Sequence, residues 1–216
     1  MSGPREKNKP SESSDGSSEA VFPDTKQQRH RNLTLCARMA PTLIALSLWT
    51  ADVALSADAP FENGWWKTEV VAGIGFDAST VNRAGDRLVT ALVEYEVPVA
   101  RRYTLGLGMI PLLWYESRRE NGEEVVGGGL GLSGRRYRLD GKYRGWYVEA
   151  KGYCILLDPE IPANTSKFNF FIGGGLGYRF QNHWQTAVKF EHISNGGLGS
   201  RNQSLNTISL SLGYNF

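Results

Sequence analysis

The chain has 216 residues, and its 24 lysines and arginines nearly balance its 22 aspartates and glutamates, which leaves a formal net charge of +2. Because the basic residues are also scattered, the sequence lacks the clustered positive charge of a nucleic-acid-binding protein. The two cysteines, Cys36 and Cys154, are too few for a cysteine-rich zinc site.

Residues 1–57 differ from the rest of the chain and are predicted to be a leader. Residues 1–32 are polar and rich in serine, a composition typical of disorder. A basic stretch, "KQQRHRN", then precedes an apolar stretch and several small residues, as in a secretory signal peptide. A transmembrane anchor is the alternative, but the apolar run from Met39 to Thr50 is shorter than the ~20 residues that span a bilayer. We expect export and one domain over residues 58–216, with the true start and the cleavage site left open.

After residue 61 apolar and polar residues alternate with a period of two, which predicts strands rather than helices. Eight such runs follow one another, at about 65–77, 86–97, 103–115, 125–137, 143–156, 168–180, 184–194 and 205–216. Most have the ~9–11 residues, or slightly more, that a tilted transmembrane strand requires.

The last run shows the alternation most clearly, because one face is apolar and the other is polar. Its apolar face comprises Ile208, Leu210, Leu212, Tyr214 and Phe216. In the first and fifth runs, lysine and glutamate side chains recur on the face opposite the apolar one. A soluble sandwich would also alternate in this way, with its polar face towards water.

The connections between the runs favour a membrane barrel over a soluble sandwich. Long polar connections ("ASTVNRAG", "SRRENGEE", "DPEIPANTSK", "NGGLGSRNQS") alternate with shorter ones near 98–102, at Asp140-Gly141 and at 181–183. Outer-membrane barrels place long loops outside the cell and short turns in the periplasm. The terminal Phe216 resembles the last-strand signal of such proteins, and aromatic residues near strand ends suit interfacial girdles: Trp65, Trp66, Trp146, Phe180, Trp184 and Tyr214. The predicted fold is an eight-stranded antiparallel up-and-down transmembrane β-barrel of the outer membrane.

Two local features of the predicted strands have structural explanations. The runs "GGGLGL" (127–132) and "GGGLGY" (173–178) do not open a helix, so they favour close packing inside a small barrel over a phosphate-binding loop. Pro111 lies within the third run, where we expect a β-bulge that exchanges the two faces beyond it.

The charged faces of the strands are predicted to point into the lumen of the barrel. They carry Lys67, Glu69, Glu94, Glu149, Lys151, Lys189 and Glu191. An eight-stranded barrel is only wide enough to be filled by side chains, so these charges must pair with one another. An ion-pair network is therefore favoured over a glycosidase-like pair of carboxylates.

The seventh run places two polar residues, His192 and Ser194, on the face opposite Lys189 and Glu191. If the lysine and glutamate point into the lumen, His192 and Ser194 face lipid near the outer end of the strand. Asn206 begins the eighth run at the same height and can reach the imidazole as a cross-strand or diagonal neighbour. Side chains two apart on a strand are roughly 7 Å apart at the backbone, which an imidazole can bridge towards a serine hydroxyl.

This constellation contains the parts that acyl transfer requires. Ser194 and His192 are a candidate nucleophile and base, Asn206 can fix the imidazole tautomer, and the turn at Asn195, Gly196 and Gly197 can offer donors to an oxyanion. The alternative is a histidine that is simply a polar residue at the membrane interface beside an ordinary loop.

The stretch "HISNGG", Asn202 and the closing "LGYNF", together with "WYVEAKGY", "ANTSKFNF" and "GGGLGYRF", resemble the PagL-type lipid A 3-O-deacylases, also called the acyloxyacyl hydrolase family. The resemblance extends from about Trp65 to Phe216. It implies an eight-stranded barrel with a lipid-facing active site that hydrolyses the ester-linked 3-hydroxyacyl chain at position 3 of lipid A.

By the same resemblance, Ser194 is the nucleophile, His192 the general base, and Asn195, Gly196 and Gly197 lie at the oxyanion hole. The family has a glutamate where this sequence has Asn206. An amide can orient the histidine, but it does not stabilise an imidazolium as a carboxylate does. In serine proteases the exchange of acid for amide costs about 10⁴ in rate.

The implied partner is lipid A, or lipopolysaccharide, in the outer leaflet of the membrane. No cofactor and no metal are expected, although a calcium ion in a loop and a homodimer stay open. A non-catalytic outer-membrane barrel with a structural or binding role is the second hypothesis. A soluble lipocalin-like binder is the third, and the predicted lumen charges disfavour it.

Overall fold

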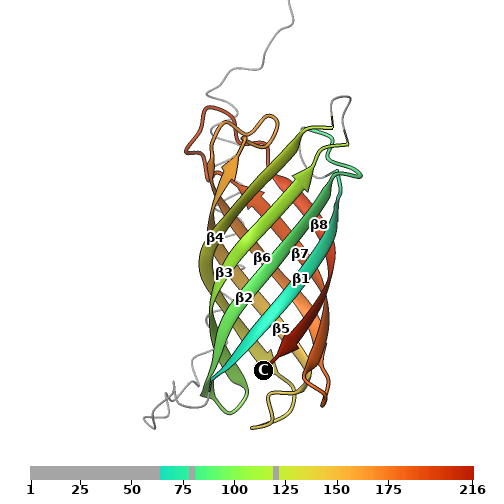
Figure 1. The fold of residues 1–216 in the computed structure, drawn as a ribbon, viewed down its shortest axis with the longest axis vertical. Coiled ribbons are helices and arrows are strands. Elements are labelled where there is room, and N and C mark those ends of the chain that lie inside the picture. Colours follow the sequence, from blue (N-terminus) through green and yellow to red (C-terminus); the bar gives the residue numbers. More distant parts are fainter. Residues whose placement is uncertain (1–63, 78–80, 119–121) are drawn as a thin grey trace, which may run out of the picture. The chain divides into compact units, whose positions relative to one another are not determined.

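The computed structural model describes residues 64–77, 81–118 and 122–216. The strands in these residues are β1 (Trp65–Gly75), β2 (Arg87–Ala100), β3 (Tyr103–Glu116), β4 (Glu124–Tyr137), β5 (Gly145–Asp158), β6 (Phe168–Arg179), β7 (Trp184–Ser194) and β8 (Leu205–Asn215). Each strand pairs antiparallel with the next, and β1 pairs with β8, so the sheet closes into a barrel (Figure 1). The predicted fold is confirmed, and every strand boundary lies within three residues of the predicted one.

The predicted leader, residues 1–57, lies outside the described residues. Within the described ranges, no helix is long and apolar enough to cross a membrane.

The alternation in the sequence becomes an apolar outer face and a polar inner face of the barrel. In β1 and β8 the outward side chains Val70, Ile74, Leu210 and Leu212 are more than half exposed. The inward side chains of the same strands are buried, because they point into the lumen. This arrangement reverses that of a soluble barrel, in which the apolar side chains fill the interior.

Charged side chains in the lumen pair with one another, as predicted, in one network around Lys67, Arg135 and Lys189 and in a separate Lys151–Glu191 pair. Lys67 lies 2.7 Å from Glu94, Lys189 lies 2.7 Å from Glu69 and 2.5 Å from Glu149, and Lys151 lies 2.5 Å from Glu191. Two charged residues of the lumen, Arg135 and Glu96, were missing from the prediction. Arg135 contacts Glu94, Glu96 and Glu149, and these four side chains are at most 1% exposed.

We expect Arg135→Met to destabilise the barrel by about 3–5 kcal/mol, because it leaves three buried carboxylates short of a cation. Urea unfolding of the detergent-purified protein, followed by the mobility of the folded barrel on gels, measures this change. Arg87→Met is the matched control, since Arg87 pairs with Glu116 on the surface, where an ion pair is worth at most about 1 kcal/mol. Equal stability of both variants would show that the lumen charges are not held by pairing.

The inward glycines of β4 and β6 make room for the large side chains that cross the lumen. A methyl group on Gly177 would lie 2.3 Å from the Tyr147 ring, and one on Gly175 would lie 3.0 Å from Lys189 Cγ. The glycine runs therefore serve close packing in a narrow barrel, as the sequence indicated.

Strand β3 contains the bulge predicted at Pro111. Its pairing with β4 shifts between Ile110 and Leu113. The buried face changes with it, from Ile110 before the bulge to Leu113 and Tyr115 after it. Proline has no N–H to donate to the neighbouring strand. The bulge confines the resulting break in the hydrogen-bond ladder to one place in β3.

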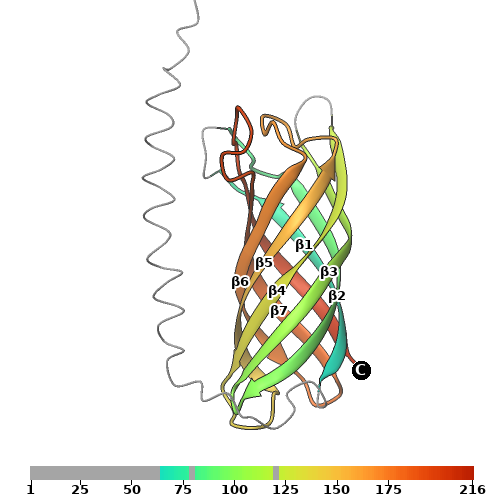
Figure 2. The same cartoon turned by 90° about the vertical axis from the view of Figure 1, so that its left-hand side faces the viewer.

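Long connections gather at one end of the barrel and short ones at the other (Figures 1 and 2). The long ones join β1 to β2, β3 to β4, β5 to β6 and β7 to β8, and these strand ends lie at the rim opposite the carboxyl terminus. The predicted Asp140-Gly141 turn is longer than a two-residue hairpin and covers 138–144. Tyr143 explains the difference, because its hydroxyl donates to the Ala100 carbonyl and its ring packs against Tyr137.

One aromatic residue departs from the predicted girdle. Trp66, Trp146, Phe180, Trp184 and Tyr214 face outward and are 37–50% exposed. Trp65 instead shares the inward face of Lys67, and the Arg179 guanidinium lies 4.4 Å from the centre of its ring. Strand alternation decides this, because Trp65 and Trp66 are neighbours and must point to opposite sides.

Candidate functional site

The outer end of β7 carries the two predicted site residues on the outer face of the barrel. Lys189, Glu191 and Ile193 point inward and are buried, whereas His192 and Ser194 alternate with them and are partly exposed. Glu191 accepts hydrogen bonds from Lys151 and Ser209 in the lumen, so it cannot serve His192. The predicted faces of β7 are therefore confirmed.

His192 is oriented by Asn206. The two residues are direct partners in the pairing of β7 with β8, and His192 Nδ1 lies 2.8 Å from Asn206 Oδ1. An amide oxygen only accepts hydrogen bonds, so Nδ1 carries the proton and Nε2 keeps its lone pair. This tautomer is the one in which the histidine can accept a proton from a hydroxyl group.

Phe76 and Phe190 lie near the His192–Asn206 pair on the barrel. The Phe76 backbone N–H donates to the Asn206 carbonyl, and its ring lies 5.8 Å from that of Phe190. Asn206 is only 7% exposed although it lies on the outer face. Shielding from water strengthens the hydrogen bond between the amide and the imidazole.

Ser194 ends β7, two residues after His192 and directly opposite Phe170 of β6. Its side chain is partly exposed, and within the described residues no hydrogen bond holds its hydroxyl group. The hydroxyl group can therefore turn towards the imidazole or towards a molecule on the outer surface. Catalytic hydrogen bonds often tighten only when substrate binds.

The turn after Ser194 is fixed by the buried side chain of Asn195. Its amide nitrogen donates to Asn164 Oδ1 and to the Arg201 carbonyl, both at 2.8 Å, and its oxygen accepts from the Gly197 N–H. Asn202 Oδ1 accepts from the Asn195 N–H. Every polar atom of the Asn195 amide is thus committed to the loop.

Gly196 is the residue of this turn whose N–H stays open. Its φ angle is +63° and that of Gly197 is +88°. Residues with a side chain rarely adopt this backbone conformation. In the part of the chain that the structure describes, no acceptor pairs with the Gly196 N–H. Of the three residues predicted for the oxyanion hole, Asn195 and Gly197 thus have backbone N–H groups that are already paired, and the Gly196 N–H is the one that could still donate to an oxyanion.

Sequence comparison agrees with this geometry. Residues 89–215 match the family described as "Lipid A 3-O-deacylase (PagL)". The chain belongs to the PagL family. It is accordingly a protein of the bacterial outer membrane. Among curated proteins, none is significantly similar to it in sequence.

Solved structures of outer-membrane barrels are similar in fold. The crystal structure of the outer membrane enzyme PagL has a TM-score of 0.53 and 14% identity, and the match covers 68% of this chain and 98% of that one. Neisserial surface protein A has a TM-score of 0.47 and 10% identity, with 71% and 97% covered. OprG from Pseudomonas aeruginosa has a TM-score of 0.41 and 11% identity, with 71% and 95% covered.

Two features around the site of this PagL-family barrel had no signal in the sequence. Asn164 lies 31 residues from Asn195 in the chain, and its role depends on contact between two loops. Arg83 is 1% exposed and joins three loops, because it contacts Asp86, the Pro162 carbonyl and the Gln203 carbonyl. Isolated asparagine and arginine residues in polar loops are indistinguishable from solvated ones until the loops are placed together.

Among residues 64–77, 81–118 and 122–216, no three His, Cys, Asp or Glu side chains are grouped so that they could hold a metal ion.

Proposed function

We propose that this protein is an outer-membrane esterase that hydrolyses the 3-O-linked hydroxyacyl ester of lipid A, with Ser194 as nucleophile and His192 as general base. The hydrogen bond from His192 Nδ1 to Asn206 Oδ1 carries the proposal, because it leaves Nε2 of the neutral imidazole as the nitrogen that can accept the proton of Ser194. Membership of the PagL family supports the substrate class.

In the first half of the reaction, His192 Nε2 takes the proton of the Ser194 hydroxyl group while Oγ attacks the ester carbonyl carbon. The Gly196 N–H stabilises the negative charge that develops on the carbonyl oxygen. The bond to the sugar oxygen then breaks, and that oxygen takes the proton from Nε2. The products are the sugar hydroxyl group and an acyl-enzyme.

In the second half, water gives a proton to His192 Nε2 and attacks the acyl-enzyme. Cleavage of the bond to Ser194 Oγ, which recovers the proton, releases the hydroxy fatty acid. The reacting ester has to reach the outer face of β7, so substrate arrives from the outer leaflet rather than from the lumen.

The aromatic outer surface near the site suits acyl chains. Phe168 and Phe170 of β6 and Phe190 of β7 are 37–44% exposed beside Ser194 and His192. These rings offer apolar contact to a chain that lies along the barrel, while the ester group stays at the height of the outer loops.

Mass spectrometry of lipid A after incubation with the detergent-purified protein tests the function. The expected result is a decrease in the mass of lipid A by one hydroxyacyl chain, and the chain that is lost should be the one at position 3. The second candidate is a non-catalytic barrel, favoured by the amide of Asn206 at the position of the family's acid. It would be adopted if lipid A stays intact with the wild type and with Asn206→Glu.

Asn164→Ala should lower the rate of deacylation by about 10- to 100-fold, because it frees the Asn195 amide and lets the Gly196 turn shift. Initial rates at saturating lipid A measure the effect. Asn82→Ala is the matched control, since Asn82 forms an exposed hydrogen bond within a different loop. A rate for Asn164→Ala equal to that of the control would exclude this positioning role.

A further inference from the structure

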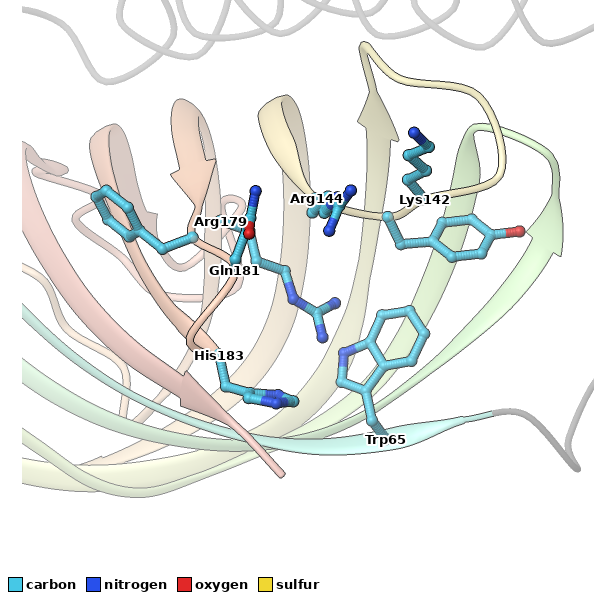
Figure 3. Close-up of a pocket in the computed structure, with 8 residues that line it drawn as sticks. Trp65, Lys142, Arg144, Arg179, Gln181 and His183 are labelled. Atoms are coloured by element: carbon cyan, nitrogen blue, oxygen red, sulfur yellow. The ribbon is translucent and has the colours of Figure 1, made fainter.

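A second site lies at the end of the barrel that carries the short connections, away from Ser194. It is a pocket of about 180 Å³ at the mouth of the lumen, between the β4–β5 connection, the β6–β7 connection and the start of β1 (Figure 3). The residues labelled in the figure are Trp65, Lys142, Arg144, Arg179, Gln181 and His183. Since short connections of outer-membrane barrels are periplasmic, the pocket opens to the periplasm.

Among the described residues, the lining of this pocket is cationic and includes no carboxylate. Lys142, Arg144 and Arg179 contribute three positive charges. In the described residues, none of the three takes part in an ion pair; the nearby Asp140 is instead within 4 Å of Arg101 and Arg102. Cations gathered at a concave surface without counter-charges attract anions.

Two hydrogen-bond donors in the pocket are buried and unpaired. Arg179 lies with its guanidinium 4.4 Å from the Trp65 ring centre, and Figure 3 shows both groups directed into the pocket. Arg179 also lies within interaction range of the Tyr137 hydroxyl group. Arg179 Nη1 and Trp65 Nε1 are buried without a hydrogen-bond partner among the described residues.

These donors are unfavourable as they stand, because a buried unpaired polar group loses its hydration without compensation. An oxyanion between them would accept from both and would neutralise the guanidinium. Stacking on the indole holds the guanidinium in a fixed plane, and a fixed fork of N–H groups matches phosphate oxygens well.

We propose that this pocket binds a phosphate group from the periplasmic side, through Arg179, the Trp65 indole and the ammonium or guanidinium groups of Lys142 and Arg144. A tetrahedral anion has oxygens for all of these donors at once, which a planar carboxylate lacks. The group belongs either to a phospholipid headgroup of the periplasmic leaflet or to a soluble phosphate.

Titration of the full barrel in phosphate-free maltoside micelles tests the proposal. The readout is the ¹H–¹⁵N resonance of the Trp65 indole, assigned from its loss in Trp65→Phe. Inorganic phosphate is added in one arm and dihexanoyl phosphatidylglycerol in the other, with chloride holding the ionic strength constant. A saturable displacement is expected. A response to the lipid at lower concentration identifies the headgroup as the source, and a response to inorganic phosphate alone identifies a soluble phosphate.

Variants show whether the pocket is responsible. Arg179→Gln should weaken binding at least about tenfold, as should the double variant Lys142→Gln/Arg144→Gln, which changes an exposed and a half-buried residue and leaves the Arg179–Trp65 stack in place. Arg101→Gln, at the same end but outside the pocket, should bind like the wild type. All three should deacylate lipid A at the wild-type rate, because Ser194 lies at the other end of the barrel.

The proposal is overturned if neither probe displaces the Trp65 resonance beyond the effect of chloride. It is also overturned if the double variant, folded by its gel mobility, binds as tightly as Arg101→Gln. Loss of deacylation in the wild type would concern the proposed function of Ser194 and not this pocket.

Discussion

Ser194→Ala should abolish release of the hydroxyacyl chain from lipid A, with a decrease in rate on the order of 10⁴-fold or more. The change removes the only oxygen that can form the acyl-enzyme and leaves His192, Asn206 and the turn in place. Mass spectrometry of lipid A over a time course, with purified wild type and variant at equal concentration, measures the decrease. A serine on a partly exposed outer face contributes little to folding, so the variant should remain a folded barrel.

Ser200→Ala is the matched control for this experiment. Ser200 is an exposed serine of the same outer loop whose hydroxyl group lies 3.0 Å from Thr165 Oγ1. We expect it to deacylate lipid A at nearly the wild-type rate. Undiminished activity of Ser194→Ala would refute the assignment of the nucleophile, and a histidine-activated water would then have to be considered.

Asn206→Glu should increase the rate of deacylation by about 10- to 100-fold. A carboxylate at this place would accept the same hydrogen bond from His192 Nδ1 and would also stabilise the imidazolium that forms during attack. This increase should be smaller than the ~10⁴-fold decrease in rate that the exchange of acid for amide causes in serine proteases. Much of that decrease comes from the wrong histidine tautomer. Here Asn206 Oδ1 already holds the productive tautomer.

Asn206→Leu completes the series, since it keeps the size of the side chain but removes the acceptor. We expect a further loss of about tenfold relative to the wild type, from an imidazole that is free to rotate. Initial rates and gel mobility are measured together so that unfolding is recognised. If Asn206→Glu and Asn206→Leu both match the wild type, residue 206 does not orient the catalytic base.

The extent of the strands and the direction of their side chains followed from the sequence for a simple reason. Alternation has a period of two, and charged residues in a membrane barrel must face the lumen, so Lys189 and Glu191 fixed the outward direction of His192 and Ser194. The pairing of His192 with Asn206 followed from counting across a hairpin whose two strands were both recognisable. Strand β7 was predicted with its observed bounds for this reason.

Contacts between loops did not follow from the sequence. The prediction placed Asn195 among the oxyanion donors, whereas Asn164 and Arg201 accept the hydrogen bonds of its side-chain amide in the structure. Loop residues have no periodicity, and their partners are far apart in the chain. The same is true of Arg83, whose three-loop contact exists only when the ends of several strands meet at one rim of the barrel.

By itself, then, the sequence determined the barrel, its inner and outer faces, and the height of His192, Ser194 and Asn206, because strand geometry converts residue spacing directly into position. The contacts across the lumen and at the periplasmic mouth depend on the closure of the barrel. This closure brought Arg135 of β4 to Glu94 and Glu96 of β2 across the lumen, and it set Trp65 of β1 beside Arg179 of β6 at the periplasmic mouth. Such contacts join strands that are not neighbours in the sheet, so only the closed fold defines their distances.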